Sequence, residues 1–353
     1  MSYDPVSLLT RLIATPSSSR DEAATAGIVA EALECEGVTV NTFYNNVWAV
    51  QPHFDPARPT LMLNSHHDTV KPSPAYSRDP YEPLRCDGRI YGLGSNDAGA
   101  SVVTLIDVFL RNYRHTLPFN LLLAITAEEE VMGERGMRAF LPHLKEMGIE
   151  PAMALVGEPT GMQPAVGERG LVVLDCTARG VAGHAARREG VNALYKAIDD
   201  IGRLRNMTFP HRSALLGPIG VEVTMINAGR QHNVIPDECH FVVDVRTTDV
   251  YTNEQTVEII RQTIESEAVP RSTRVRASVL SEDNPMVRAA VELGGTPFVS
   301  PTTSDMALMY DIPSLKMGPG ESSRSHTADE YVLESEIADA VKKYDMFINR
   351  IIL

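Results

Sequence analysis

The chain has 353 residues, of which 43% are hydrophobic and 22% are charged, a composition typical of a globular protein with room for two domains. Its formal net charge of −14 argues against a nucleic-acid-binding protein, because phosphate contacts need a basic surface. No stretch approaches the roughly 18 apolar residues that a membrane span needs. The first five residues lack the basic and apolar regions of a secretory signal.

The four cysteines are widely spaced and form no CxxC pair. A disulfide scaffold and a thiolate zinc site are therefore not expected. Scattered free thiols fit a reducing compartment, so the sequence predicts a cytoplasmic protein.

The first half of the chain alternates between amphipathic helices and short apolar strands. The predicted helices span residues 4–14, 21–36, 98–113 and 135–147, and the predicted strands span 38–43, 47–50, 60–64, 120–126 and 152–156. This alternation predicts an α/β fold, in which a mostly parallel sheet carries helices on both faces. A Pro-rich loop covers residues 71–93.

Three of these strands lead directly into histidine or acidic residues: His66-His67-Asp68, Glu128-Glu129-Glu130, and Glu158. Sites in open α/β sheets form beyond the carboxyl ends of the strands, so these side chains are expected to meet. Strand side chains alternate, which places His66 and Asp68 on one side and His67 on the other. His66 is then the predicted metal ligand, and Asp68 the group that binds its second ring nitrogen. Taken singly, these motifs also fit a surface His pair or a solvated acidic run at a helix start.

The predicted ligand set is completed by residues from a helix start and from near the C-terminus. It consists of His66, Asp97, Glu130, Glu158 and His326. Two imidazoles and three carboxylates suit zinc, cobalt or manganese. Five ligands exceed the needs of one tetrahedral ion but fit two ions roughly 3.5–4 Å apart, bridged by one carboxylate. Asp97 is the predicted bridge, and Glu129, next to the ligand Glu130, is the predicted general base.

The pattern changes near residue 167. Predicted strands at 171–177, 221–226 and 240–246 and predicted helices at 191–204 and 253–267 indicate a smaller inserted α+β domain. The chain then returns through a strand at 275–279, a helix at 284–293, a strand at 314–317 and a helix at 334–349. The predicted domains are 1–168 with 280–353, which binds metal, and 169–279, which is inserted.

The motifs resemble, in order and over nearly the whole chain, those of the M20 family of dinuclear metallohydrolases. The resemblance implies a catalytic α/β domain interrupted by a lid or dimerisation domain, and a homodimer. It implies terminal ligands at His66, Glu130, Glu158 and His326, and a bridge at Asp97. Two positions depart from the common family pattern: Glu128 stands where an Asp is usual, so the base could lie one position away, and no Met-Lys pair follows Asp97.

Further resemblance concerns substrate binding. The segment Gly180–Ala185 resembles the family stretch whose histidine reaches the partner's active site, which implies that His184 stabilises the oxyanion. Asn233 and Arg246 lie in segments that resemble substrate-binding pieces, and Arg246 is the implied partner of the substrate carboxylate. Gly318 and Gly320 resemble a loop that offers N–H groups to that carboxylate, although a plain turn would read the same.

The resemblance implies hydrolysis of an N-acyl amino acid and favours N-acetyl-L-ornithine or N-succinyl-L-ornithine as substrate, in arginine biosynthesis, with zinc or cobalt as the metal. Alternatives are a succinyl-diaminopimelate desuccinylase, an M20 dipeptidase, and a non-catalytic relative that only binds metal. A succinyl group would add a second carboxylate that needs a cation. The candidates are Arg78, Arg85, Arg179, Arg187, Arg188, Arg230 and Arg324.

Overall fold

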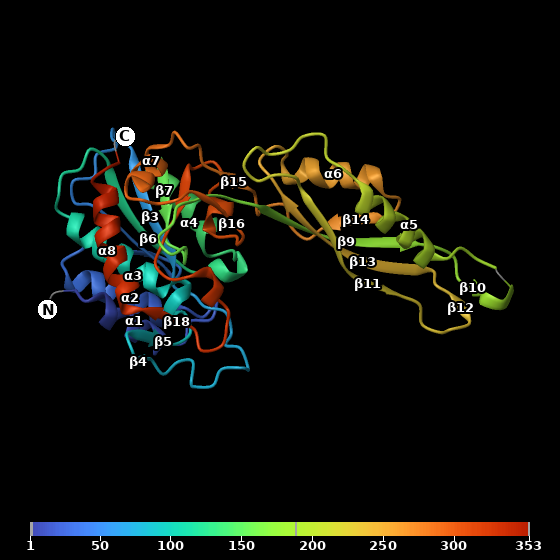
Figure 1. The fold of residues 1–353 in the computed structure, drawn as a ribbon, viewed down its shortest axis with the longest axis horizontal. Helices are drawn as coiled ribbons and strands as arrows, with labels where there is room; N and C mark the ends of the chain where they lie inside the picture. Colours follow the sequence, from blue (N-terminus) through green and yellow to red (C-terminus); the bar gives the residue numbers. More distant parts are fainter. Residues whose placement is uncertain (1–2, 188, 352–353) are drawn as a thin grey trace. The chain divides into compact units, whose positions relative to one another are not determined.

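The computed structural model describes residues 3–187 and 189–351, and the chain divides into two compact units (Figure 1). The first unit comprises residues 1–166, 280–298 and 304–353, and the second comprises 167–279 and 299–303. Among the described residues, no helix is long and apolar enough to cross a membrane. The assignment of the second unit as a lid or dimerisation domain stays a prediction.

The first unit is built on a twisted sheet with helices between its strands. Its helices are α1 (Pro5–Ile13), α2 (Ala23–Cys35), α3 (Ala100–Asn112), α4 (Met137–Glu146), α7 (Pro285–Glu292) and α8 (Glu334–Ile348). Its strands are β1 (Asn41–Phe43), β2 (Asn46–Val50), β3 (Thr60–His66), β4 (Leu84–Cys86), β5 (Arg89–Tyr91), β6 (Asn120–Thr126), β7 (Met153–Val156), β17 (Ser314–Lys316) and β18 (Tyr331–Leu333). Strands β8 (Ala165–Glu168), β15 (Ser278–Val279) and β16 (Phe298–Ser300) lie where the chain passes between the units.

The large sheet has the order β1-β2-β6-β3-β7-β17-β8-β15. Its four central strands, β6, β3, β7 and β17, are mutually parallel, and antiparallel strands flank them. The predicted α/β fold with a mostly parallel sheet is therefore confirmed. Because the central strands are parallel, their carboxyl ends share one edge of the sheet.

Strand β3 shows how both faces of the sheet are covered. Leu61 and Leu63 pack into a core with residues of α1, α2, α3, α7 and α8, whereas Met62 points the other way into a second core with α4. Every residue of β3 is buried, as expected for a strand covered on both faces. Two apolar layers thus fix the register of the strand that ends in His66.

The second unit contains a four-stranded antiparallel sheet with the order β11-β13-β9-β14. Its elements are β9 (Gly170–Arg179), β10 (Gly183–His184), α5 (Ala193–Asn206), β11 (Gly220–Ala228), β12 (Val234–Ile235), β13 (Glu238–Thr247), α6 (Asn253–Thr263) and β14 (Glu267–Pro270). Helices α5 and α6 lie beside this sheet (Figure 1). Apolar residues of β9 and β13 form one core with the two helices. Strands β10 and β12, of two residues each, pair with each other in a separate small sheet.

Several predicted boundaries were wrong. The helix predicted over 253–267 ends at Thr263, because the buried Asp200 carboxylate accepts hydrogen bonds from the backbone N–H groups of Glu265 and Ser266 and turns the chain into β14. The prediction also missed the short strands β4, β5, β8, β10, β12, β14, β16 and β18. Segments of two to four residues are too short to show an alternating pattern.

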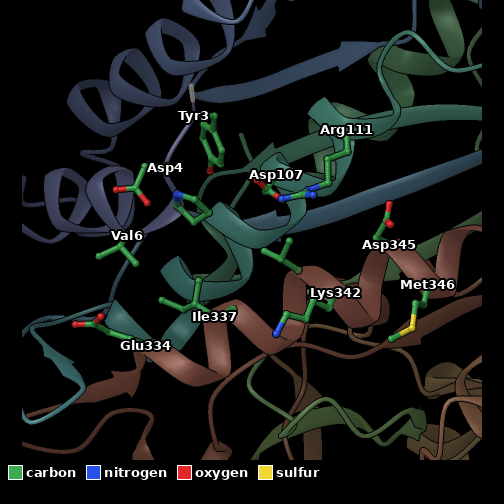
Figure 2. Close-up of a pocket in the computed structure, with 13 residues that line it drawn as sticks. Tyr3, Asp4, Val6, Asp107, Arg111, Glu334, Ile337, Lys342, Asp345 and Met346 are labelled. Atoms are coloured by element: carbon green, nitrogen blue, oxygen red, sulfur yellow. The ribbon is translucent and has the colours of Figure 1, made fainter. Parts of the chain in front are cut away.

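A cavity of about 710 Å³ lies between the start of α1, α3 and α8 (Figure 2). The Tyr3 hydroxyl donates to the Val103 carbonyl beside it, and Arg111 pairs with Asp107 within its wall. None of its lining residues is a predicted metal ligand. The cavity is therefore separate from the candidate site described next.

Candidate metal centre

The predicted ligands of the first unit converge at the carboxyl ends of the parallel strands. His66 is the last residue of β3 and lies opposite Thr126, the last residue of β6. Glu129 and Glu130 follow β6, and Glu158 follows β7. Asp97 arrives from the segment between β5 and α3. Strand geometry thus delivers groups far apart in sequence to one edge of the sheet.

His66 is buried, and its two ring nitrogens face different partners. Nδ1 lies 3.0 Å from the Asp68 carbonyl oxygen and 3.3 Å from Asp68 Oδ1. Since a carbonyl only accepts, Nδ1 carries the proton and donates. Nε2 faces carboxylates: it lies 3.3 Å from Asp97 Oδ1, 3.6 Å from Glu158 Oε1 and 3.8 Å from Glu129 Oε2. The nitrogen available to an ion therefore points at the acidic cluster.

Asp97 lies between the two histidines. Its Oδ1 faces His66 Nε2, and its Oδ2 lies 3.7 Å from His326 Nε2. His326 Nε2 also lies 3.1 Å from the Glu130 carboxylate. Two sets of three residues each place their potential ligand atoms within 4.8 Å of one another. One set is His66, Asp97 and Glu130, and the other is His66, Glu129 and Glu158. Imidazole nitrogens and carboxylate oxygens gathered in this way fit divalent ions such as zinc.

Asp68 does more than contact His66. Its two carboxylate oxygens accept hydrogen bonds from the backbone N–H groups of Glu129 and Glu130, at 3.0 and 3.2 Å, and from the Ser19 hydroxyl. Burial would raise the pKa of Asp68, but the hydrogen bond and charge of His66 and the hydrogen bond from Ser19 outweigh it and lower that pKa. One ionised carboxylate thus orients the imidazole and also the turn that carries two other site residues.

The three consecutive glutamates take different positions. Glu128 faces away, and its carboxylate accepts from the Arg135 backbone N–H. Glu129 is buried beside His66, and Glu130 contacts His326. His67 likewise turns away from the cluster and contacts Thr25 and the Asn45 carbonyl.

The electrostatics of the cluster follow from crowding buried acids together. Burial raises the pKa of Glu129 well above its ordinary value, and nearby Glu158 adds to this. Burial also raises the pKa of Glu158 to about 8. Burial lowers the pKa of His66, but Glu129, Asp68 and Asp97 outweigh it and raise that pKa well above its ordinary value. Side chains whose pKa values are shifted by burial and by specific neighbouring charges are concentrated in functional sites.

Several residues at this edge were not predicted. Asp305 is buried, accepts from the Thr126 hydroxyl, and has a pKa raised to about 6 by burial. Lys316, the last residue of β17, is buried near Glu158, whose pKa it lowers. Glu330 is buried and bonds the backbone that leads to Asp97. Of these three residues, only Glu330 could have been suspected from the sequence, because it is the last residue of the motif that contains His326.

The glycines of the predicted carboxylate loop are tightly packed. The Gly318 N–H donates to Thr160 Oγ1, and a Cβ there would lie 2.5 Å from the Glu158 carbonyl oxygen. Gly320 has a positive φ of 81°, and a Cβ there would lie 2.2 Å from Asn96 Oδ1. Both positions therefore require glycine for close approach of the chain.

The remaining predicted site residues belong to the second unit. His184 is exposed on β10, next to Asn233, whose carbonyl accepts from the Ala185 N–H. Arg246 forms a two-pronged pair with Asp244. Within their own units, the candidate arginines Arg78, Arg85, Arg179 and Arg324 each pair with an acidic residue. Arg188 lies outside the described residues.

A family model described as peptidase family M20/M25/M40 matches residues 62–350. The chain is 28% identical over 385 aligned positions to succinyl-diaminopimelate desuccinylase of Rhizorhabdus wittichii, covering 99% of this chain and 98% of that one.

Solved structures share the fold. Aminopeptidase PepT from Bacillus cereus matches with a TM-score of 0.77 at 18% identity, covering 98% of both chains. The Bacillus subtilis YXEP protein, described as a dinuclear metal binding peptidase from the M20 family, matches with a TM-score of 0.72 at 17% identity, covering 98% of this chain and 96% of that one.

Proposed function

Because the chain belongs to the peptidase family M20/M25/M40, we propose that it hydrolyses the amide bond of an N-acyl amino acid, with N-succinyl-diaminopimelate as the first candidate substrate. The resemblance to the M20 family is thereby confirmed, and the chain is an enzyme that acts on amide bonds. The observation that carries the proposal is the placement of Asp97 between His66 and His326, with Glu129 beside them.

We propose that two divalent ions, zinc or cobalt, bind at this edge of the sheet. His66, Asp97 and Glu158 would hold one ion, and Asp97, Glu130 and His326 the other. This division is supported by the two Asp97 oxygens, each of which faces a different histidine. Bound there, such ions polarise an amide carbonyl and increase the acidity of water.

In this proposal Glu129 is the general base. It takes a proton from the attacking water and returns it to the departing amine. Burial among other acids raises the pKa of Glu129, which suits a group that must bind and release a proton. Glu128 is less suited to the role, because its carboxylate is bonded to the Arg135 backbone.

The roles in substrate binding are also proposals. His184 would stabilise the oxyanion, and Asn233, Arg246 and the loop of Gly318 and Gly320 would bind the substrate carboxylate. Arg246 would have to exchange its Asp244 partner for the substrate. The bonded Gly318 N–H is less available than that of Gly320.

The identity of the acyl amino acid is drawn from the relatives. The family resemblance favours N-acylornithine, but the chain is similar over nearly its full length to a succinyl-diaminopimelate desuccinylase. We therefore place N-succinyl-diaminopimelate first and N-acetylornithine or N-succinylornithine second. A cytoplasmic location stays a prediction.

We also propose that two copies of the chain pair through the second unit. Its strand β11 is at a sheet edge and exposes Met225 and Ile226. Helix α5 exposes Tyr195 and Ile198. Exposed apolar side chains next to an unpaired strand edge are typical of an association surface. Light scattering after size-exclusion chromatography tests this.

The decisive experiment is a hydrolysis panel with the zinc- or cobalt-loaded protein. It contains N-succinyl-diaminopimelate, N-succinylornithine, N-acetylornithine and a dipeptide. We expect the highest kcat/KM for N-succinyl-diaminopimelate. A preference for an ornithine derivative or the dipeptide would replace the first substrate, and no turnover of any compound by metal-loaded protein would refute amide hydrolysis in favour of a non-catalytic relative.

A further inference from the structure

Glu330 is a buried carboxylate whose place in the fold is explained by neither the ligand set nor the core. It is 2% exposed and lies just before β18. It accepts hydrogen bonds from three backbone N–H groups of one loop, those of Gly94 (3.2 Å), Asn96 (2.8 Å) and Asp97 (2.9 Å). The third of these groups belongs to the residue that lies between the two histidines.

The same loop reaches back to the segment that precedes Glu330. The Asn96 side chain accepts from the Glu321 N–H at 3.0 Å and donates to the Glu321 carbonyl at 3.1 Å and to Ser325 Oγ at 3.2 Å. Two segments more than 200 positions apart thus bond each other from both sides. We call residues 94–97 and 321–330, joined by Asn96 and Glu330, the loop clamp.

Each half of the loop clamp carries one potential metal ligand. Asp97 ends the first segment, and His326 lies between the Asn96 contacts and Glu330 in the second. These two side chains face each other, with Asp97 Oδ2 3.7 Å from His326 Nε2. A shift of either segment would therefore change the separation of the two ligands directly.

The chemistry at both ends of the loop clamp is specific. Three backbone N–H donors converge on Glu330, and both of its carboxylate oxygens accept. A glutamine would direct its NH₂ donors toward some of the same N–H groups. At the other end, a Cβ on Gly320 would lie 2.2 Å from Asn96 Oδ1, so the chain leaves room for this side chain.

We propose that Glu330 and Asn96 are positioning residues that set Asp97 opposite His326 and so create the affinity of the ion that these two ligands share. The inference rests on the proposed two-metal function and deepens it. Neither residue contacts the substrate or an ion in this role. Groups that hold metal ligands in place typically contribute 10- to 100-fold to metal affinity.

The test compares zinc binding by wild type, Glu330→Gln and Asn96→Ala, using a chromogenic chelator as competitor. We expect wild type to bind two equivalents. Both variants should bind one equivalent about 10- to 100-fold more weakly than wild type. The other equivalent should change less, because His66 and Glu158 still hold it. The visible absorption of cobalt-loaded protein should change mainly for the weakened equivalent.

Asp200→Asn is the matched control. Asp200, in α5, is also a buried carboxylate that accepts from two backbone N–H groups, but the turn that it bonds carries none of the proposed metal ligands. This variant should lower the melting temperature and leave both zinc equivalents unchanged, which separates loss of stability from loss of positioning. Asn96→Ala decides the question if Glu330→Gln does not fold.

Failure of the two proposals looks different. If wild type binds fewer than two equivalents, the two-metal function is wrong, and the loop clamp inference falls with it. If wild type binds two and the folded variants bind both equally well, only the loop clamp inference is wrong. The same conclusion follows if Asp200→Asn loses one equivalent as the variants do.

Discussion

Replacement of Glu129 by glutamine should separate catalysis from stability. The change keeps the shape of a buried side chain but removes its ability to take a proton. We expect metal-loaded Glu129→Gln to keep its bound zinc and to lose about 10²- to 10⁴-fold in kcat, the usual contribution of a general base. Metal content by atomic emission and kcat on the best substrate of the panel measure the two quantities.

The same change should stabilise the metal-free protein at neutral pH. Burial, with Glu158 close by, raises the pKa of Glu129 well above its unfolded value near 4.5. The folded state must therefore keep this group protonated while the unfolded state releases the proton, so stability falls as pH rises above 4.5. Over the roughly 2.5 pH units up to pH 7, this cost reaches at most about 3 kcal/mol.

Glutamine needs no proton, so the variant escapes this cost. Thermal melts in chelator should show a gain that is near zero at pH 4.5 and grows to several degrees at pH 7. Glu128→Gln is the matched control, because that carboxylate bonds the Arg135 backbone outside the cluster. A gain that does not depend on pH, or an equal gain in the control, would refute the assignment of Glu129 as the buried acid.

Two further perturbations test the cluster and its packing. Burial raises the pKa of Glu158 and of Glu330 to about 8, and Glu130 raises that of His326 to about 9. The folded metal-free protein therefore binds more protons than the unfolded chain, so its melting temperature should fall from pH 5 to pH 9. The melting temperature of the zinc-loaded protein should depend less on pH. A rise with pH would contradict this. Gly318→Ala should lower the free energy of unfolding by about 1–3 kcal/mol and weaken zinc binding, because the new Cβ meets the Glu158 backbone. The control Gly202→Ala in α5, with no atom within 4 Å of the new Cβ, should be neutral or stabilising. Equal melting temperatures for the two variants would refute the packing argument.

The part of the site that the sequence predicts is the part carried by strands. An apolar run that ends in His66 implies a buried strand, and parallel strands bring their carboxyl ends to one edge. The alternation of strand side chains correctly separates His66 from His67, which contacts Thr25 and Asn45 instead. These inferences work because they depend on local periodicity and on one general property of α/β sheets.

The part that the sequence does not predict depends on contacts between distant segments. Glu330 and Asn96 meet although 234 positions separate them, and no periodic pattern encodes such a pair. Asp305 and Lys316 are similar cases: each is a single polar residue in an irregular or very short segment, and its burial follows from the packing of other elements. Ordinary charged residues in loops look the same in sequence.

The distinction explains why the acidic cluster needs more than strands. Strands place His66 and Glu158 rigidly, since both sheet faces are packed. Asp97 and His326 come from irregular segments, so strand pairing does not fix their positions. The Glu330 and Asn96 bonds fix those segments instead, and they act on backbone N–H groups, so the ligand side chains stay available. When the segments of Asp97 and His326 become mobile, the site should therefore first lose affinity for the ion that these two residues share.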